Sequence, residues 1–155
     1  MKTKKSNKII TPRDFWELPY GCVFKLTEDS PILYIKSVDD DAYIISGDSN
    51  KVAGLRASSE FDNDDLVFPV NYDFEIAIPS LLKCHEVMDD EIVVGDCYLY
   101  YDEWWMAITQ TDDVDDMIYA NKDDHLGINL RTGETQPRVG QNRVTPVEVT
   151  LSVED

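Results

Sequence analysis

The side chains best suited to metal chemistry in this sequence are its cysteines and histidines, namely Cys22, Cys84, His85, Cys97 and His125. Structural zinc sites take four such ligands at short, fixed spacings. No C-x-x-C or H-x₃-H pair occurs, and Cys22 and Cys97 fall in segments that resemble core strands. We therefore expect buried thiols and ordinary histidines, and we expect no cofactor or dedicated metal site.

Catalytic motifs are also missing from the sequence. It contains no G-x-S-x-G and no glycine-rich phosphate loop, and the neighbours Cys84 and His85 would point apart in any regular element. Neither Asp39–Asp41 nor the cluster 112–116 has the spacing of an EF-hand calcium loop. Carboxylate pairs can act as acid and base, but among 31 Asp and Glu residues their proximity is uninformative. We expect the chain not to be an enzyme.

Charge is the strongest compositional feature. The net charge is −17, although all five Lys and Arg of the first thirteen residues precede the first acidic residue. The remainder, 14–155, carries 9 Lys and Arg against 31 Asp and Glu, a net charge of −22. Such a body repels nucleic acid and anionic membranes and attracts basic surfaces. A compact chain of this length spans about 40–50 Å. A DNA duplex of that length carries roughly 25 negative charges, close to the charge of the body, so the body could imitate DNA electrostatically. Solubility alone is the simpler explanation.

The acidic residues gather with aromatic residues at a few predicted turns. Adjacent strand residues face opposite sides, so only one of Trp104 and Trp105 can enter the same core, and the other could anchor a partner. The predicted partner-binding residues are carboxylates of two Asp clusters and one acidic–aromatic turn: Asp39, Asp40, Asp41, Asp102, Glu103, Trp104, Trp105, Asp112, Asp113, Asp115 and Asp116.

The segments that would position these residues form an internal repeat in the sequence. The stretch from Gly21 to Ile76 returns from Gly95 to Val153, at an offset of 74 between those glycines. The offset is 77 between the prolines of the last matched strands, Pro69 and Pro146. Within this match, Ala42–Ile45 is paired with residues 117–120, and the Gly54 segment with the Gly127 segment. The two Asp clusters then occupy the same hairpin tip in each copy.

Alternating apolar and polar residues predict five short strands in each copy. The expected fold is mainly β, with two tandem SH3-like five-stranded barrels. We divide the chain into a basic tail with a lead-in turn (1–20), a first β unit (21–78), a connecting segment with a short helix (79–91) and a second β unit (92–155). Thr11 and Pro12 should start the lead-in turn, with Trp16 docking inward. The connecting helix should begin at Ser80 and return to solvent at residues 89–91.

Cellular setting follows from what the sequence lacks. No apolar run approaches the ~20 residues of a membrane span, and the basic N-terminus has no secretory pattern behind it. An odd, sparse count of three cysteines is typical of a reducing interior. We expect a cytoplasmic protein.

Two functional hypotheses remain open. One is a non-enzymatic acidic module that binds a protein with a basic surface, including one that normally holds nucleic acid, and so acts as a DNA-mimicking inhibitor. Small size and strong acidity of this kind are typical of viral and mobile-element accessory proteins. The other is a structural or assembly protein whose acidity serves only solubility.

Overall fold

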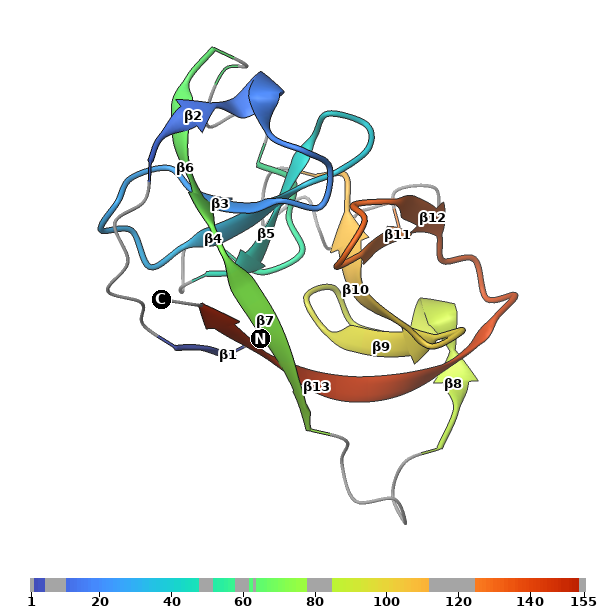
Figure 1. The fold of residues 1–155 in the computed structure, drawn as a ribbon. Coiled ribbons are helices and arrows are strands. Elements are labelled where there is room, and N and C mark those ends of the chain that lie inside the picture. The colour runs from blue at the N-terminus through green and yellow to red at the C-terminus, as the bar shows by residue number, and fades with distance from the viewer. Residues whose placement is uncertain are drawn as a thin grey trace.

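The computed structural model of the chain describes residues 2–4, 11–47, 52–57, 62, 64–77, 85–111 and 125–153. Its elements are short strands and two single-turn 3₁₀ helices (Figure 1): β1 (Lys2–Lys4), β2 (Arg13–Asp14), η1 (Phe15–Glu17), β3 (Val23–Lys25), β4 (Leu33–Lys36), β5 (Ala42–Ser46), β6 (Leu66–Val70), β7 (Tyr72–Ala77), β8 (Val87–Met88), η2 (Asp89–Glu91), β9 (Cys97–Tyr100), β10 (Glu103–Thr109), β11 (His125–Asn129), β12 (Thr135–Pro137) and β13 (Arg143–Val153).

The fold is mainly β, as predicted, and its strands form two sheets, one of them a curled half-barrel. The five-stranded sheet has the order β2-β6-β3-β4-β5, and the larger sheet has the order β1-β13-β9-β10-β11-β12, with β7 and β8 also on β13. The predicted hairpin over Asp39–Asp41 is confirmed, because β4 and β5 are antiparallel with Lys36 opposite Ala42.

The two halves of the chain repeat the same strand pairings. In the first half β6 pairs with β2 and β3, and β3 pairs with β4. In the second half β13 pairs with β8 and β9, and β9 pairs with β10. Val23 stands opposite Val70, and Cys97 stands opposite Val147. These registers repeat at the offsets of 74 and 77 predicted from the sequence.

One part of the predicted match is wrong. Residues 117–120 lie outside the described residues, and the strand that pairs with β10 is β11. Ala42 stands opposite Lys36, and Gly127 stands opposite Ala107, so Gly127 is the equivalent of Ala42 and not of Gly54. The reason is that the connection between β10 and β11 is longer than the connection between β4 and β5, which moves the offset beyond it.

The halves meet through a strand pair that crosses from one to the other. One residue, Asn71, separates β6 from β7, and β7 pairs antiparallel with the end of β13. In this pair Phe74 stands opposite Leu151, which is its own equivalent 77 residues later. An antiparallel pair of equivalent strands in this register is two-fold symmetric, so the chain is a pseudo-dimer of its two halves. Figure 1 shows β7 (green) crossing β13 (dark red).

Reciprocal backbone contacts support the same pseudo-symmetry. The N–H of Val38 donates to Gly133 O at 3.0 Å, and the N–H of Thr109 donates to Gly54 O at 2.9 Å. Both glycines have a positive φ, +97° for Gly54 and +77° for Gly133, which side chains rarely adopt. Each half therefore offers a glycine turn to a strand of the other.

The central core belongs to both halves. It joins buried residues of β3, β4, β5 and β6 to those of β9, β10, β11 and β13, including Val23, Ile35, Met106 and Ile128. Each half adds a smaller outer cluster, one around Phe24 and one containing Tyr98, Trp105 and Val144. Burying apolar surface jointly in this way makes the stability of one half depend on the other.

The lead-in and connecting segments differ in part from expectation. The predicted turn forms as η1, but it begins after Asp14, so the predicted start at Thr11 and Pro12 is wrong. Trp16 is 57% exposed, so its predicted inward docking is also wrong, whereas Phe15 and Leu18 are buried. The predicted connecting helix falls mostly on residues 78–84, outside the described residues. Its described end forms β8 and η2, and Asp89 is buried rather than in solvent because its carboxylate accepts the N–H of Gly140 at 2.7 Å.

Candidate partner-binding surface

The first Asp cluster forms the tip of the β4–β5 hairpin. Asp39 and Asp40 are exposed, and Asp41 is half-buried. The tip is closed by backbone bonds from the Asp40 N–H to Ser37 O at 3.1 Å and from the Ser37 N–H to Asp41 O at 2.8 Å. Asp40 has a φ of 61°, a left-handed conformation that Asp tolerates better than most residues. The turn therefore holds two carboxylates outward on a fixed frame.

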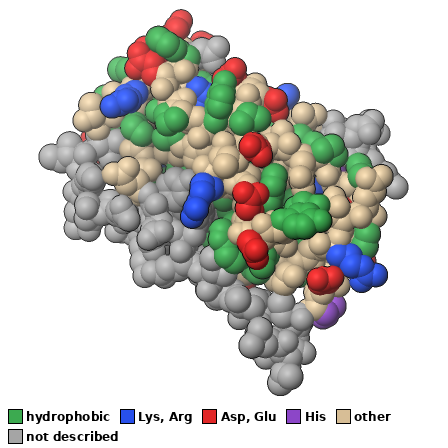
Figure 2. Space-filling view, turned by 45° about the vertical axis from the view of Figure 1, so that its right-hand side comes forward, with side chains coloured by type: hydrophobic (Ala, Val, Ile, Leu, Met, Phe, Trp, Pro, Cys, Tyr) green, Lys and Arg blue, Asp and Glu red, His purple; other side chains and the backbone are tan. Residues whose placement is uncertain are grey.

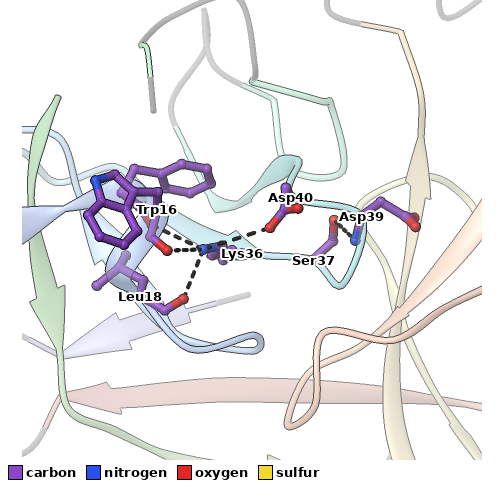
Figure 3. Close-up of polar contacts among 7 residues, drawn as sticks. Trp16, Leu18, Lys36, Ser37, Asp39 and Asp40 are labelled. Atoms are coloured by element: carbon purple, nitrogen blue, oxygen red, sulfur yellow. Dashed lines mark hydrogen bonds and ion pairs between the residues drawn. The ribbon is translucent and has the colours of Figure 1, made fainter. Parts of the chain in front are cut away.

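This tip also touches elements beyond its own hairpin. The hydroxyl of Thr135 donates to the Asp39 carboxylate at 3.1 Å, which ties the tip to the second half. The carboxylate of Asp40 lies 3.9 Å from the Lys36 ammonium, as Figure 3 shows. Asp40 is therefore partly neutralised, while the oxygens of Asp39 retain capacity to accept further hydrogen bonds.

Lys36 itself is buried and was not predicted. Its ammonium donates to the backbone oxygens of Phe15 at 3.1 Å, Trp16 at 3.2 Å and Leu18 at 2.9 Å (Figure 3). Burial lowers the pKa of Lys36, and the neighbouring Asp40 carboxylate raises it. A lysine inside the apolar run 32–38 was the signal in the sequence, because a buried charge needs compensating partners.

The second half holds its 3₁₀ turn with a cation from a different part of the chain, after β12. The guanidinium of Arg138 donates to the backbone oxygens of Asp89 at 3.3 Å and Ile92 at 2.8 Å. These carbonyls are 74 positions after those of Phe15 and Leu18. Each 3₁₀ turn is thus held by a buried cation that donates to carbonyl groups of the turn and of the residue after it.

The acidic–aromatic turn is the tip of the β9–β10 hairpin. Tyr101 and Asp102 have φ values of 49° and 62°, as a tight two-residue hairpin turn requires. Tyr101 is 83% exposed, and Asp102 and Glu103 are exposed beside it. Glu103 also accepts the side-chain N–H of Asn129 at 3.1 Å. This turn therefore presents two carboxylates next to an exposed aromatic ring.

The two tryptophans separate as their alternation predicts. Trp105 is buried in the outer cluster of the second half, and its indole N–H has no recorded hydrogen-bond partner. Trp104 is half-buried and packs against the central core. Only Trp104 of the two therefore retains appreciable exposed surface. The remaining predicted residues, Asp112, Asp113, Asp115 and Asp116, lie outside the described residues.

Two hollows at equivalent places in the halves were not predicted from the sequence. A first-half hollow of about 330 Å³ is lined by Pro19, Cys22, Val23, Val70, Asn71 and Arg131, among others. A second-half hollow of about 360 Å³ is lined by Glu91, Val93, Asp96, Cys97, Val147 and Glu148, among others. Five of the six residues named for the first have their equivalents, at offsets of 74 or 77, among those of the second. The shared fold builds both hollows.

Each hollow has one cysteine in its wall. Burial raises the pKa of the Cys97 thiol to about 12 and also raises the pKa of Cys22, so both remain thiols at neutral pH. Among the described residues, no group of three or more His, Cys, Asp or Glu side chains is placed to hold a metal ion.

On the face drawn in Figure 2, Asp and Glu side chains stand apart from one another, with apolar and other uncharged atoms between them. No helix in the described part of the chain is both long and apolar enough to cross a membrane. Comparison with known proteins returned no matching family model, no matching curated protein and no matching solved structure.

Proposed function

We propose that the chain is a non-enzymatic acidic binding module that docks carboxylates on a basic surface of a partner protein. The observation that carries this proposal is the placement of acid on rigid hairpin tips. Asp39 and Asp40 at one tip, and Asp102 and Glu103 at the other, are all exposed. Each half thus contributes one carboxylate-bearing turn.

Electrostatics supports the same function. With a body of −22, long-range attraction speeds encounter with a basic partner, and short-range contacts at the tips select it. The separation of carboxylates in Figure 2 differs from the continuous phosphate rows of a duplex. The proposal therefore rests on recognition of a basic protein. A stronger form of it is that the chain occupies the partner's nucleic-acid site, and competition with a DNA duplex tests that form.

Binding to a purified basic nucleic-acid-binding protein, a core histone, tests the proposal. We expect saturable binding that weakens steeply as salt rises from 50 to 500 mM, because exposed charges are screened within ~10 Å at ~0.1 M. A 20-base-pair duplex should compete for the histone if the shared site is the nucleic-acid site. Affinity that stays constant with salt would contradict the electrostatic mechanism.

Matched charge variants localise the effect. Asp39→Asn with Asp102→Asn and Glu103→Gln should weaken binding at least tenfold. Glu17→Gln with Glu28→Gln and Asp29→Asn removes the same charge from other exposed positions and serves as the control. Equal losses in both variants would show that net charge, and not the tips, determines binding.

A structural or assembly role is the second candidate, and exposed apolar groups in the first half favour it. Trp16, Tyr20 and Leu66 are 57%, 51% and 60% exposed, which suits contact with another protein surface. Light scattering distinguishes this role. A defined oligomer that persists at 500 mM salt and dissociates on Trp16→Ser with Leu66→Ser would support it, and a monomer at all salt concentrations would exclude self-assembly.

We also infer that each half is a small barrel of the SH3-like kind. The strand order supports this inference, since successive strands pair in a meander and the last strand returns to the first: β6 to β3, and β13 to β9. In the first half the meander ends at the bridge between Tyr43 and Arg56. An experimental structure with closed pairing in each half would verify it.

A further inference from the structure

The second-half hollow is a recurring feature of the fold. Its equivalent in the first half has nearly the same size, about 330 against 360 Å³. The first-half hollow lies between the loop before β3 and the junction of β6 with β7, and the second-half hollow lies between the loop before β9 and the equivalent part of β13. Cys97 and Val147 line one hollow where Val23 and Val70 line the other. Because both halves contain the hollow, it is a property of their shared fold and not of individual side chains.

What differs between the two hollows is their charge. Asp96 stands where the first half has Cys22, and Glu148 stands where it has Asn71. Glu91 is a third carboxylate in the wall of the second-half hollow, which contains no Lys or Arg. The first-half hollow has no carboxylate in its wall and contains Arg131. Repetition of the fold has therefore produced one acidic hollow and one that is not acidic.

The wall between these carboxylates is apolar. Val93 is 67% exposed at the rim, whereas Cys97 and Val147 are 5% and 7% exposed in the floor. Glu91, Asp96 and Glu148 are all exposed, and no ion pair joins any of them to another described residue. One oxygen of Glu91 accepts the Met88 N–H at 2.7 Å, which fixes that carboxylate at the mouth.

A long cationic side chain matches this combination. Arginine and lysine bury their aliphatic stems along apolar surface while the charged head remains at the rim. The planar guanidinium presents five donors and pairs with carboxylates through two parallel hydrogen bonds, so it uses several carboxylates better than an ammonium does. A volume of about 360 Å³ is at the lower end of ligand clefts, which suits one or two side chains.

We propose that the second-half hollow binds an arginine side chain from an extended segment of the partner protein, with Glu91, Asp96 and Glu148 around the guanidinium and Val93 against the stem. This inference rests on the proposed function and specifies where a basic partner is recognised. The first-half hollow, with Arg131 in its wall, disfavours the same ligand.

The test uses the full chain and the peptide acetyl-Val-Arg-Val-amide as probe, followed by NMR at 50 mM salt. Saturable amide shifts should centre on Val93, Asp96 and Glu148 and be absent from Tyr20, Cys22 and Asn71 in the wall of the first-half hollow. Acetyl-Val-Lys-Val-amide should bind more weakly, and acetyl-Val-Gln-Val-amide should not bind. Shifts of equal size in both hollows, or equal binding of the glutamine peptide, would overturn the proposal.

Variants complete the test. Asp96→Asn with Glu148→Asn, the latter being the residue type of the first half, should weaken peptide binding at least tenfold. The matched control Glu28→Gln with Asp29→Asn removes the same charge from an exposed turn of the first half and should change affinity less than twofold. Thermal unfolding of each variant confirms that both remain folded, and equal losses in the two variants would overturn the hollow as the site.

The outcome also separates this inference from the proposed function. Peptide shifts that map to the Asp39–Asp41 tip would overturn the hollow and leave a basic partner in place. Absence of saturable shifts anywhere, with salt-sensitive histone binding retained, would likewise overturn only the hollow. Salt-insensitive histone binding would overturn the proposed function itself.

Discussion

At the residue scale, the two halves contain a compensating pair of substitutions. Phe24 and Ala42 lie together in the outer cluster of the first half. Their equivalents are Tyr98 and Gly127, and a Cβ at Gly127 would fall on the Tyr98 hydroxyl. The space of one methyl group thus holds the added oxygen. That buried hydroxyl has no recorded hydrogen-bond partner, and burial raises the pKa of Tyr98.

This pair makes a prediction for mutants. Gly127→Ala should destabilise the protein by ~1–3 kcal/mol because the added methyl overpacks a closed site. Adding Tyr98→Phe should restore most of the loss, since it recreates the pair of the first half. Urea unfolding of the two single mutants and the double mutant measures the coupling. A cost of Gly127→Ala that is the same with Tyr and with Phe at position 98 would contradict this account.

At the element scale, each 3₁₀ turn depends on a cation from elsewhere in the chain. Lys36 comes from β4 and Arg138 follows β12, yet they bind equivalent carbonyls. The position equivalent to Lys36 in β10 is Ala107, as the strand registers show. The cation therefore comes from a different segment in each half, whereas its carbonyl partners are equivalent. The requirement belongs to the turn, because a single-turn helix cannot satisfy its own terminal carbonyls.

Removing either cation should loosen the turn it holds. We expect Lys36→Met to lower the free energy of unfolding by ~3 kcal/mol, because it leaves buried carbonyl groups without their charged hydrogen-bond donor. Arg138→Met should have a similar effect on η2. Lys25→Met, at the half-buried position of β3, removes the same charge and serves as the control. Urea midpoints measure the effect, and a cost for Lys36→Met no larger than that for Lys25→Met would refute it.

At the scale of the whole molecule, the shared core and the β7–β13 pair make the halves interdependent. Residues from both halves meet in one buried cluster, and each half gives its last strand to the pair at the pseudo-dyad. A domain of ~60 residues is marginal by itself, and here the main buried cluster is shared. The molecule should therefore unfold as one unit.

Native-state hydrogen exchange tests this interdependence. The amides of Ile35 and Ile45 in the first half, and of Met106 and Ile108 in the second, should report the same opening free energy within ~1 kcal/mol. The mutation Val23→Ala should lower all four values together, because Val23 packs in the shared core. Protection that falls only in the first half would show two independent folding units.

The sequence alone determined the local features of this protein. Period-two patterns identified most strands, the Asp39–Asp41 turn located a hairpin tip, and the spacings of Gly21 to Gly95 and Pro69 to Pro146 carried the repeat. These signals survive because alternation and turn chemistry act over a few residues. The match failed after the first hairpin of the repeat, where unequal connections shift the offset and only strand pairing can show it.

Tertiary structure alone decided the rest. No local pattern reveals that β7 pairs with β13, that Arg138 replaces Lys36, or that Asp96 and Glu148 share one hollow. Each of these depends on segments far apart in sequence, whose meeting is determined by the summed burial of both halves. The sequence pointed to its carboxylates as the groups that would bind a partner. The fold decided which of them lie around an apolar wall.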